Sequence, residues 1–235
     1  MCDFIKIRMN FLSHFYFERY ATQPERVLGG ILPDLLKNAD KRYMFHPNRF
    51  ETILLDHPQF KPIYESWNRH LEVDRIFHNT PFFFDHTHRL RIKIQDSLSG
   101  LPVRPSFLAH VALELILDHL LLKHQVINVD RFYEDLEKVH PDTIIKFLKI
   151  IGLEDTTKFM SYYERFVNSK YTYEYADITR ISHALFNIAK RIWDFEPEAG
   201  HHLQLTEELI MYTDKQLTDY KSIYFEIQDR LSLTE

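Results

Sequence analysis

Acidic and imidazole side chains recur at helical spacing in the most apolar segment of the chain. Twelve of the sixteen residues 107–122 are apolar, yet His110, Glu114 and Asp118 recur every four residues. This spacing places the three on one stripe of a helix, with His119 beside them. A buried carboxylate without a partner is strongly destabilising. The stripe therefore indicates metal binding or acid–base chemistry, with an internal salt-bridge stripe or one exposed helix edge as the alternative.

A second stripe lies upstream, in the segment PIYESWNRHLEVDRIFHNT. Five residues follow one another there at spacings of 4, 3, 4 and 4: Ile63, Trp67, His70, Asp74 and His78. An apolar helix face thus continues into a His–Asp–His stripe. A histidine and an aspartate one helical turn apart can ligate one metal ion. The alternative is a surface ion pair, which is common and weak, but Trp67 favours an inward-facing stripe.

Two further candidates precede these stripes. His14 interrupts the apolar run MNFLSHFYF, and Asp34 follows a proline in GGILPDLLK. Each has an ordinary alternative, since the histidine could belong to the core and the aspartate could begin a helix segment. With the stripes they complete a set of three imidazoles and three carboxylates: His14, Asp34, His70, Asp74, Asp118 and His119. Such a set without sulfur suits Mn²⁺, Fe²⁺ or Mg²⁺, with zinc possible, and a cation would offset the burial of the carboxylates.

The elements that would position these residues are predicted to be helices throughout. Spacings of three and four dominate, and prolines punctuate the periodic segments. We expect helices at 10–21, 25–37, 48–55, 61–79, 85–98, 105–125, 130–138, 141–151, 155–168, 176–193 and 204–232. The last has the clearest apolar period, formed by Ile210, Leu217, Tyr220, Tyr224, Ile227 and Leu231. A single all-α domain, residues 1–235, is the simplest architecture.

Composition narrows the classes of function. Of the 235 residues, 45% are hydrophobic and 27% charged, which excludes a disordered chain and a membrane bundle. Only five glycines occur, which disfavours glycine-rich phosphate loops and all-β folds. The single cysteine, Cys2, excludes an intrachain disulfide and a Cys-rich zinc site, and it favours a reducing compartment. A net charge of −5 argues against a general nucleic-acid binder.

Targeting signals are not evident in the sequence. The opening residues MCDFIKIRMNF lack the apolar stretch and cleavage site of a signal peptide. The apolar run 107–122 is too short and too polar to predict a bilayer span. We therefore expect a soluble, cytoplasmic protein without a membrane partner.

Four blocks of the sequence resemble the acyl carrier protein phosphodiesterase family, a distant relative of the HD metal-dependent phosphohydrolases. The blocks are MNFLSH (9–14), GGILPD (29–34), the pair His70 and Asp74 with Pro81 seven residues later, and ELILDHLL (114–121). Their order and approximate spacing agree across residues 9–125. A weaker similarity, ITRISHALFNIAKRI, lies at 178–192, within the C-terminal helices predicted for residues 126–235.

The resemblance implies a helical fold and a specific reaction. Members of the family use Mn²⁺ or a similar ion to hydrolyse the phosphodiester that joins 4′-phosphopantetheine to a serine of holo-acyl carrier protein. For this reaction we expect a ligand core of Asp34, His70, Asp118 and His119, with His14 and Asp74 in or just behind it. His78 or His110 would protonate the leaving serine oxygen.

This chain departs from the family pattern at three positions. The Asn that usually follows the glycine of the second block is Gly30, the Arg that usually follows the histidine of the third block is Leu71, and a family Asp is His78. Histidine can still ligate a metal or transfer a proton. Residues 1–8 precede the first family block, and we expect them to be an added N-terminal extension. Alternatively, translation starts at Met9.

The acidic surface of an acyl carrier protein would require a basic docking surface on this chain. Two clusters qualify: Lys37, Lys41 and Arg42, and Arg89, Arg91 and Lys93. Each could equally be an ordinary solvated helix face. Two other functions stay open, a helical phosphohydrolase of a nucleotide or small phosphodiester and a non-catalytic helical interaction protein. The oligomeric state is left open.

Overall fold

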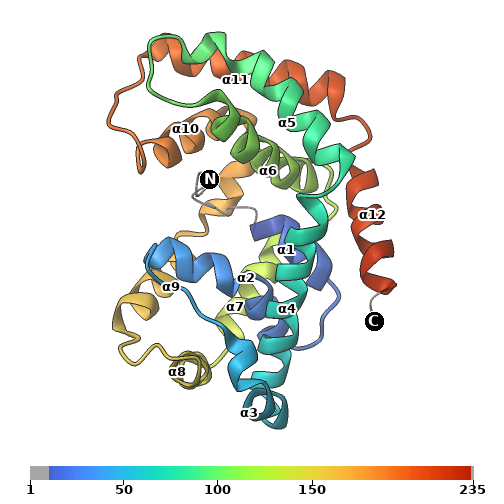
Figure 1. Cartoon of the computed structure of the whole chain (residues 1–235), viewed down its shortest axis with the longest axis vertical. Helices are drawn as coiled ribbons and strands as arrows, with labels where there is room; N and C mark the ends of the chain where they lie inside the picture. The colour runs from blue at the N-terminus through green and yellow to red at the C-terminus, as the bar shows by residue number, and fades with distance from the viewer. Residues whose placement is uncertain (1–10, 234–235) are drawn as a thin grey trace. The chain divides into compact units, whose positions relative to one another are not determined.

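The computed structural model describes residues 11–233, and these contain helices and loops without a β-strand (Figure 1). The predicted all-α class is thereby confirmed. The α-helices are α1 (Phe11–Glu18), α2 (Pro24–Ala39), α3 (Glu51–Asp56), α4 (Phe60–Phe77), α5 (Pro81–Ile94), α6 (Pro105–Lys123), α7 (Val129–Lys138), α8 (Pro141–Ile150), α9 (Thr157–Ser169), α10 (Ile178–Ala189), α11 (Ala199–Gln216) and α12 (Lys221–Ser232). Short 3₁₀ helices cover Pro47–Phe50, Asp96–Leu98 and Tyr171–Ala176.

Packing groups the described residues into two units. The first contains residues 11–73 and 127–173, and the second contains residues 74–126 and 174–233. The boundary falls inside α4 after Val73, so the last turn of this helix is counted with the second unit although the helix is continuous. The single domain expected from the sequence stays a prediction, and the expected extension 1–8 lies outside the described residues.

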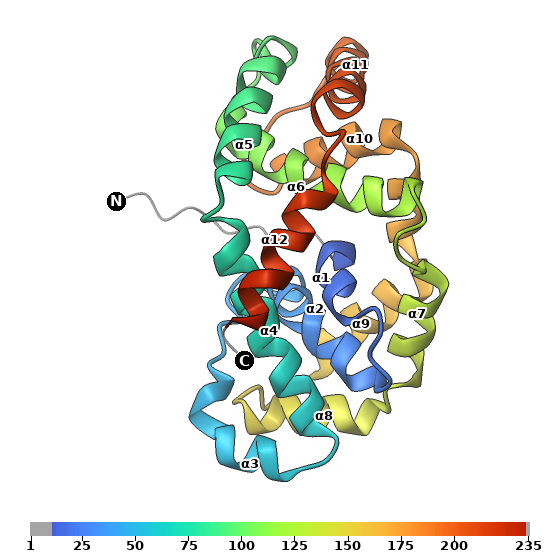
Figure 2. The same ribbon diagram turned by 90° about the vertical axis from the view of Figure 1, so that its right-hand side faces the viewer.

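The first unit is organised around α2. This helix packs against α1, α7 and α9, and Figure 2 shows α1 and α2 side by side. All eight residues of α1 are buried, because its sequence FLSHFYFE offers an aromatic or aliphatic side chain on nearly every face. Phe11 and Phe15 of α1 pack their rings against Phe166 and Phe132, with centroids 5.0 and 5.1 Å apart. The core of this unit is therefore largely aromatic.

The second unit is organised around α6, which packs against α5 and α10, while α11 packs against α5 and α10. Pro105 begins α6, where its missing N–H and fixed φ suit the first turn. By length and composition α6 could cross a membrane, but 72% of its most apolar 18-residue window is buried. Such burial is typical of the core helix of a soluble protein, while the cytoplasmic location stays a prediction.

Two of the differences from the expected helix boundaries have a clear cause in the structure. The predicted helix 85–98 begins earlier, at Pro81, because the side chain of Thr80 accepts a hydrogen bond from the Phe83 N–H at 3.1 Å and caps the first turn. The predicted helix 204–232 is two helices, α11 and α12. The connection between them is fixed by Tyr220, whose hydroxyl donates to the Leu120 carbonyl at 3.2 Å. The predicted apolar stripe is nevertheless buried from Leu217 onward.

Candidate metal centre and its surroundings

Two consecutive glycines allow α2 and α4 to approach closely in the first unit. A Cβ on Gly29 would lie 2.3 Å from the carbonyl oxygen of Ile63, which is a steric clash, so only glycine fits at this position. A Cβ on Gly30 would lie 3.2 Å from Ser66 Oγ and 3.3 Å from Glu18 Cγ. This close packing brings the backbone of α2 within reach of side chains on α4.

The closest contact made possible by this packing orients His70. Its Nδ1 lies 2.8 Å from the carbonyl oxygen of Gly30. Because a carbonyl only accepts hydrogen bonds, Nδ1 carries the proton and donates it. Nε2 is then the nitrogen directed at Asp34, 3.6 Å from Oδ1, and both side chains are fully buried. A backbone acceptor on one ring nitrogen is the usual way in which proteins prepare the other nitrogen to ligate a metal.

His14 of α1 completes this cluster, together with Asp74. The His14 and His70 rings are stacked, with centroids 3.7 Å apart and planes inclined by 23°. Asp74 lies one turn after His70 on the same continuous helix. His14, His70 and Asp74 each offer a ligand atom within 4.8 Å of the others, and all three residues are buried. We call His14, Asp34, His70 and Asp74 the first cluster.

The first cluster fits a divalent cation. A neutral His70 presents a lone pair toward Asp34, and a carboxylate is also an acceptor, so a proton or a cation between them is needed for attraction. His14, His70 and Asp74 supply the N/O donors that divalent metals take in proteins, and Asp34 lies beside His70 Nε2. The structure therefore supports the coarser part of the sequence prediction, namely that buried His/Asp groups here could bind a metal ion.

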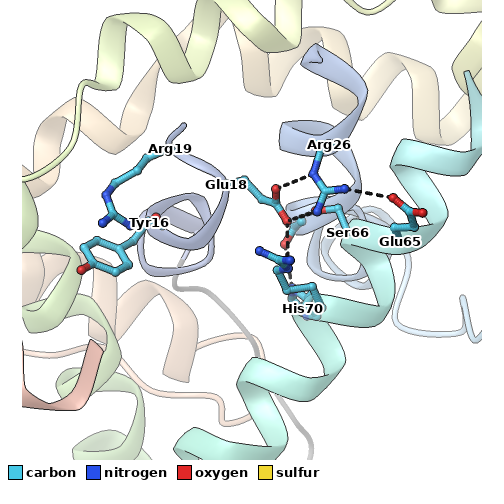
Figure 3. A network of polar contacts seen from close by, with 9 residues as sticks. Tyr16, Glu18, Arg19, Arg26, Glu65, Ser66 and His70 are labelled. Carbon is cyan, nitrogen blue, oxygen red and sulfur yellow. Dashed lines mark hydrogen bonds and ion pairs between the residues drawn. The ribbon is translucent and has the colours of Figure 1, made fainter. Parts of the chain in front are cut away.

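A buried ion network next to the first cluster was missed by the sequence analysis. Figure 3 shows Glu18 of α1 between Arg26 of α2 and Ser66 of α4. Arg26 Nε donates to Glu18 Oε2 at 2.9 Å, and Ser66 Oγ donates to Glu18 Oε1 at 2.7 Å. Arg26 also reaches Glu65 at 3.0 Å. Burial opposes the charge of Arg26, but the two carboxylates outweigh it and raise the pKa of the guanidinium.

This network ties together the three helices that carry the first cluster. Glu18 is one turn after His14, and Ser66 is one turn before His70. The His/Asp stripes therefore continue into a second layer of polar contacts on the same helix faces. Searching one helical turn before His70 would have identified Ser66, and searching one turn after His14 would have identified Glu18.

The second unit contains a different cluster, formed by His78, His110 and Glu114, which we call the second cluster. The Nε2 atoms of His78 and His110 lie 3.2 Å apart, and Glu114 Oε1 lies 3.4 and 3.1 Å from them. His78 Nδ1 donates to the carbonyl oxygen of Asp74 at 2.7 Å. Proton transfer by the two histidines stays a prediction. Glu114 was expected on the polar stripe of its helix but was not assigned as a ligand.

Charges within the second cluster stabilise one another. Burial by itself would raise the pKa of Glu114, but His110 and His78 outweigh it and lower that pKa. Burial opposes the positive charge of His78, yet Glu114 and Asp74 raise its pKa. Glu114 is therefore ionised, and the imidazoles are its counter-charge in the metal-free chain.

Asp118 and His119 are both buried on α6 in the second unit. His119 Nδ1 lies 2.8 Å from the Tyr175 carbonyl oxygen and must donate to it. Burial lowers the pKa of His119, so its ring is neutral near pH 7. Its Nε2 is buried and has no hydrogen-bond partner among the described residues. His119 is thus prepared as a ligand, and its convergence with the first cluster stays a prediction.

In each of the two basic clusters, one side chain is paired with a carboxylate. Lys37 on α2 and the exposed Lys41 are near each other, with Lys37 Nζ 3.4 Å from the Lys41 carbonyl oxygen. Arg42 is exposed but pairs with Asp40 at 2.7 Å. On α5, Arg89 is exposed, Arg91 is half-buried, and Lys93 pairs with Glu208 at 2.6 Å. Their role in binding an acidic partner stays a prediction.

Comparison of this chain with known protein families, curated proteins and solved structures gave no match.

Proposed function

We propose that this chain is a metal-dependent hydrolase of phosphodiesters, with Mn²⁺, Mg²⁺ or Fe²⁺ as its cofactor. The observation that carries the proposal is the orientation of His70 in the first cluster. Its Nδ1 is held by the Gly30 carbonyl, and its Nε2 faces Asp34 at 3.6 Å in a fully buried position. Burial of the His70 imidazole and the Asp34 carboxylate next to each other is unfavourable unless a cation binds both.

The substrate is inferred from the sequence blocks that position the same residues. These blocks resemble acyl carrier protein phosphodiesterases, so we propose holo-acyl carrier protein as substrate and its 4′-phosphopantetheine arm as leaving product. Asp34 is followed on the same helix by Lys37 and then by the exposed Lys41 and Arg42. A basic segment after a ligand residue would favour approach of an acidic protein and fix its orientation.

Each residue of the first cluster would have its own role in binding the ion or in positioning a ligand. A bound divalent ion would neutralise the phosphodiester charge and lower the pKa of a water that attacks phosphorus. Asp34 and Asp74 would provide the negative charge that holds the ion, and His70 would be kept in one tautomer by Gly30. His14 would fix the plane of His70 by stacking, and the Glu18–Arg26–Ser66 network would hold the three helices in register.

The direct test is mass spectrometry of holo-acyl carrier protein incubated with the purified chain and Mn²⁺. We expect the apo-protein to appear as the arm is released. Asp34→Asn keeps the side-chain volume but removes the charge that faces His70. Because loss of a group that merely holds a metal ligand in place reduces activity about 10- to 100-fold, Asp34→Asn should reduce it by at least about 100-fold.

The matched control is Asp56→Asn, which removes a carboxylate from an exposed position at the end of α3. It should leave the rate unchanged. Turnover of bis(p-nitrophenyl) phosphate without action on holo-acyl carrier protein would replace the proposed substrate with a small phosphodiester. Absence of bound metal in the purified chain, with no response to added Mn²⁺, would refute the enzyme and favour a non-catalytic helical protein.

A further inference from the structure

The second cluster has the geometry of a metal site that is separate from the first. Three ligand-capable atoms, His78 Nε2, His110 Nε2 and Glu114 Oε1, form a triangle with sides of 3.1, 3.2 and 3.4 Å. Nitrogen and oxygen ligands about 2.1 Å from one ion lie about 3.0 Å apart at octahedral angles and about 3.4 Å apart at tetrahedral angles. The three sides fall within this interval.

Hydrogen bonds alone do not satisfy this triangle. The Asp74 carbonyl fixes the proton of His78 on Nδ1, so a neutral His78 presents a lone pair at Nε2. One proton shared by the two Nε2 atoms would leave a lone pair facing the Glu114 carboxylate. A proton on each Nε2 would serve the carboxylate but place two N–H donors 3.2 Å apart. A cation is attracted to all three atoms at once.

The surroundings favour ligand geometry over a flexible ion pair. Phe83 contacts both imidazoles edge-on, with ring centroids 4.8 Å from His78 and 4.9 Å from His110. The planes of the two rings are therefore fixed from the apolar side. Glu114 is buried, and its second oxygen, Oε2, has no hydrogen-bond partner among the described residues. Oε2 is thus a further acceptor on the same carboxylate, and a metal ion would compensate its burial more fully than the two imidazoles alone.

We propose that His78, His110 and Glu114 bind one divalent transition-metal ion, with Zn²⁺ as the ion that this ligand set favours. Two imidazoles and one carboxylate are a recurrent ligand set of sites that keep positions open for water or substrate. The His78 and His110 side chains are 27% and 35% exposed, so the ion would face solvent on one side. The two histidines then act as ligands in place of the proton transfer expected from the sequence.

This site does not rest on the proposed phosphodiesterase function. The first cluster supplies its own imidazoles, His14 and His70, and its own carboxyl oxygens. Substitution of His70 and substitution of His110 should therefore remove different ions. A negative result in the holo-acyl carrier protein assay would not contradict the second metal site. Absence of metal at the second site would not change the expected result of that assay.

The test counts Zn²⁺ ions on the tag-free, full-length chain after chelator treatment and dialysis against micromolar Zn²⁺. We expect His110→Gln and Glu114→Gln each to bind one ion per chain fewer than the unsubstituted protein. The matched control is His88→Gln, which removes an exposed histidine from α5 and should retain every ion. Replacing Zn²⁺ with Co²⁺ should give a visible absorption band that His110→Gln lacks and His88→Gln keeps.

The inference is wrong if both variants bind as many Zn²⁺ ions, as tightly, as the unsubstituted chain, or if that chain binds none. Far-ultraviolet circular dichroism establishes that each variant is folded. Glu114 is buried and its substitution can destabilise α6, but His110 is partly exposed, so His110→Gln keeps the test decisive.

Discussion

The first and second clusters use the same kinds of side chain but depend on different levels of structure. In the first, His14, Asp34 and His70 come from three helices, and their contact depends on the close approach at Gly29 and Gly30. In the second, His110 and Glu114 are one turn apart on α6, and His78 is held by the end of α4. Packing of three helices therefore makes the first site, whereas the second combines a local pair on α6 with one tertiary contact to His78.

Asp74 contributes to both clusters through different atoms. Its carboxylate belongs to the first, whereas its main-chain carbonyl fixes the tautomer of His78 in the second. A side-chain substitution at this position should therefore remove a possible ligand from the first cluster, while it keeps the main-chain hydrogen bond that orients His78 in the second. Substitutions can therefore test the two clusters separately.

The largest effect should come from removing both clusters at once. At a free ion concentration of 100 times Kd, one bound ion stabilises the folded state by about 2.7 kcal/mol, and two independent ions by about 5 kcal/mol. We expect His70→Gln and His110→Gln each to abolish one such increment and the double variant to abolish both. Urea unfolding with and without added Mn²⁺ and Zn²⁺ measures this. A double variant that differs from the sum of the singles would show that the clusters are coupled.

A methyl group at Gly29 should disrupt the first cluster alone. The new Cβ would meet the Ile63 carbonyl at 2.3 Å, so α2 and α4 must separate. Forced overpacking of this kind lowers the free energy of unfolding by about 1–3 kcal/mol. Gly29→Ala should therefore lose stability and the ion removed by His70→Gln, while it keeps the ion removed by His110→Gln. These are read from urea unfolding and from metal content.

Gly200→Ala is the control for that substitution. Gly200 lies in the first turn of α11, and a Cβ there has no atom within 4 Å. We expect unchanged or slightly higher stability, because alanine restricts the unfolded chain more than glycine does. Equal losses in both variants would mean that the close approach of α2 and α4 is not what holds the first cluster.

Helical periodicity predicted the local part of both sites. The stripe that contains His70 is buried from Ile63 to Asp74, and so are Glu114, Asp118 and His119 on α6, because spacings of three and four fix which residues share a helix face. Periodicity does not determine which faces meet. His70 donates a hydrogen bond to the Gly30 carbonyl, 40 positions away, and His119 donates one to the Tyr175 carbonyl, 56 positions away. Because these acceptors belong to the backbone, the spacing of side chains in the sequence cannot predict them.

The division of the C-terminal segment into α11 and α12 was missed for the same reason. The apolar period continues through Leu217 and Tyr220 although the helix does not. Tyr220 is anchored to the end of α6 by its hydroxyl, a tertiary contact across 100 residues. The apolar period correctly predicts which residues are buried, but it does not predict that the helix ends and a new one begins between them.

Within the first unit, Glu18→Gln should have a smaller effect than Gly29→Ala. The amide keeps a partner for Ser66 but removes the charge that Arg26 faces in a buried setting. We expect the free energy of unfolding to fall by about 1–2 kcal/mol. Glu65→Gln changes the same network at a carboxylate that is 40% exposed, and its effect should stay below about 1 kcal/mol. A larger loss for Glu65→Gln in urea unfolding would contradict the assignment of Glu18 as the centre of the network.

The smallest effect concerns acid sensitivity that does not arise from either cluster. Hydrogen bonds from Arg42 and Lys158 hold the pKa of Asp40 well below its ordinary value of 3.8. A carboxyl whose pKa is depressed on folding stabilises the folded state above its unfolded pKa, and this contribution is lost as pH falls through the folded value. Asp40→Asn should therefore flatten the dependence of unfolding free energy on pH below about 4, which urea unfolding at a series of pH values measures. An acid limb that Asp40→Asn leaves unchanged would contradict the assignment of this sensitivity to Asp40.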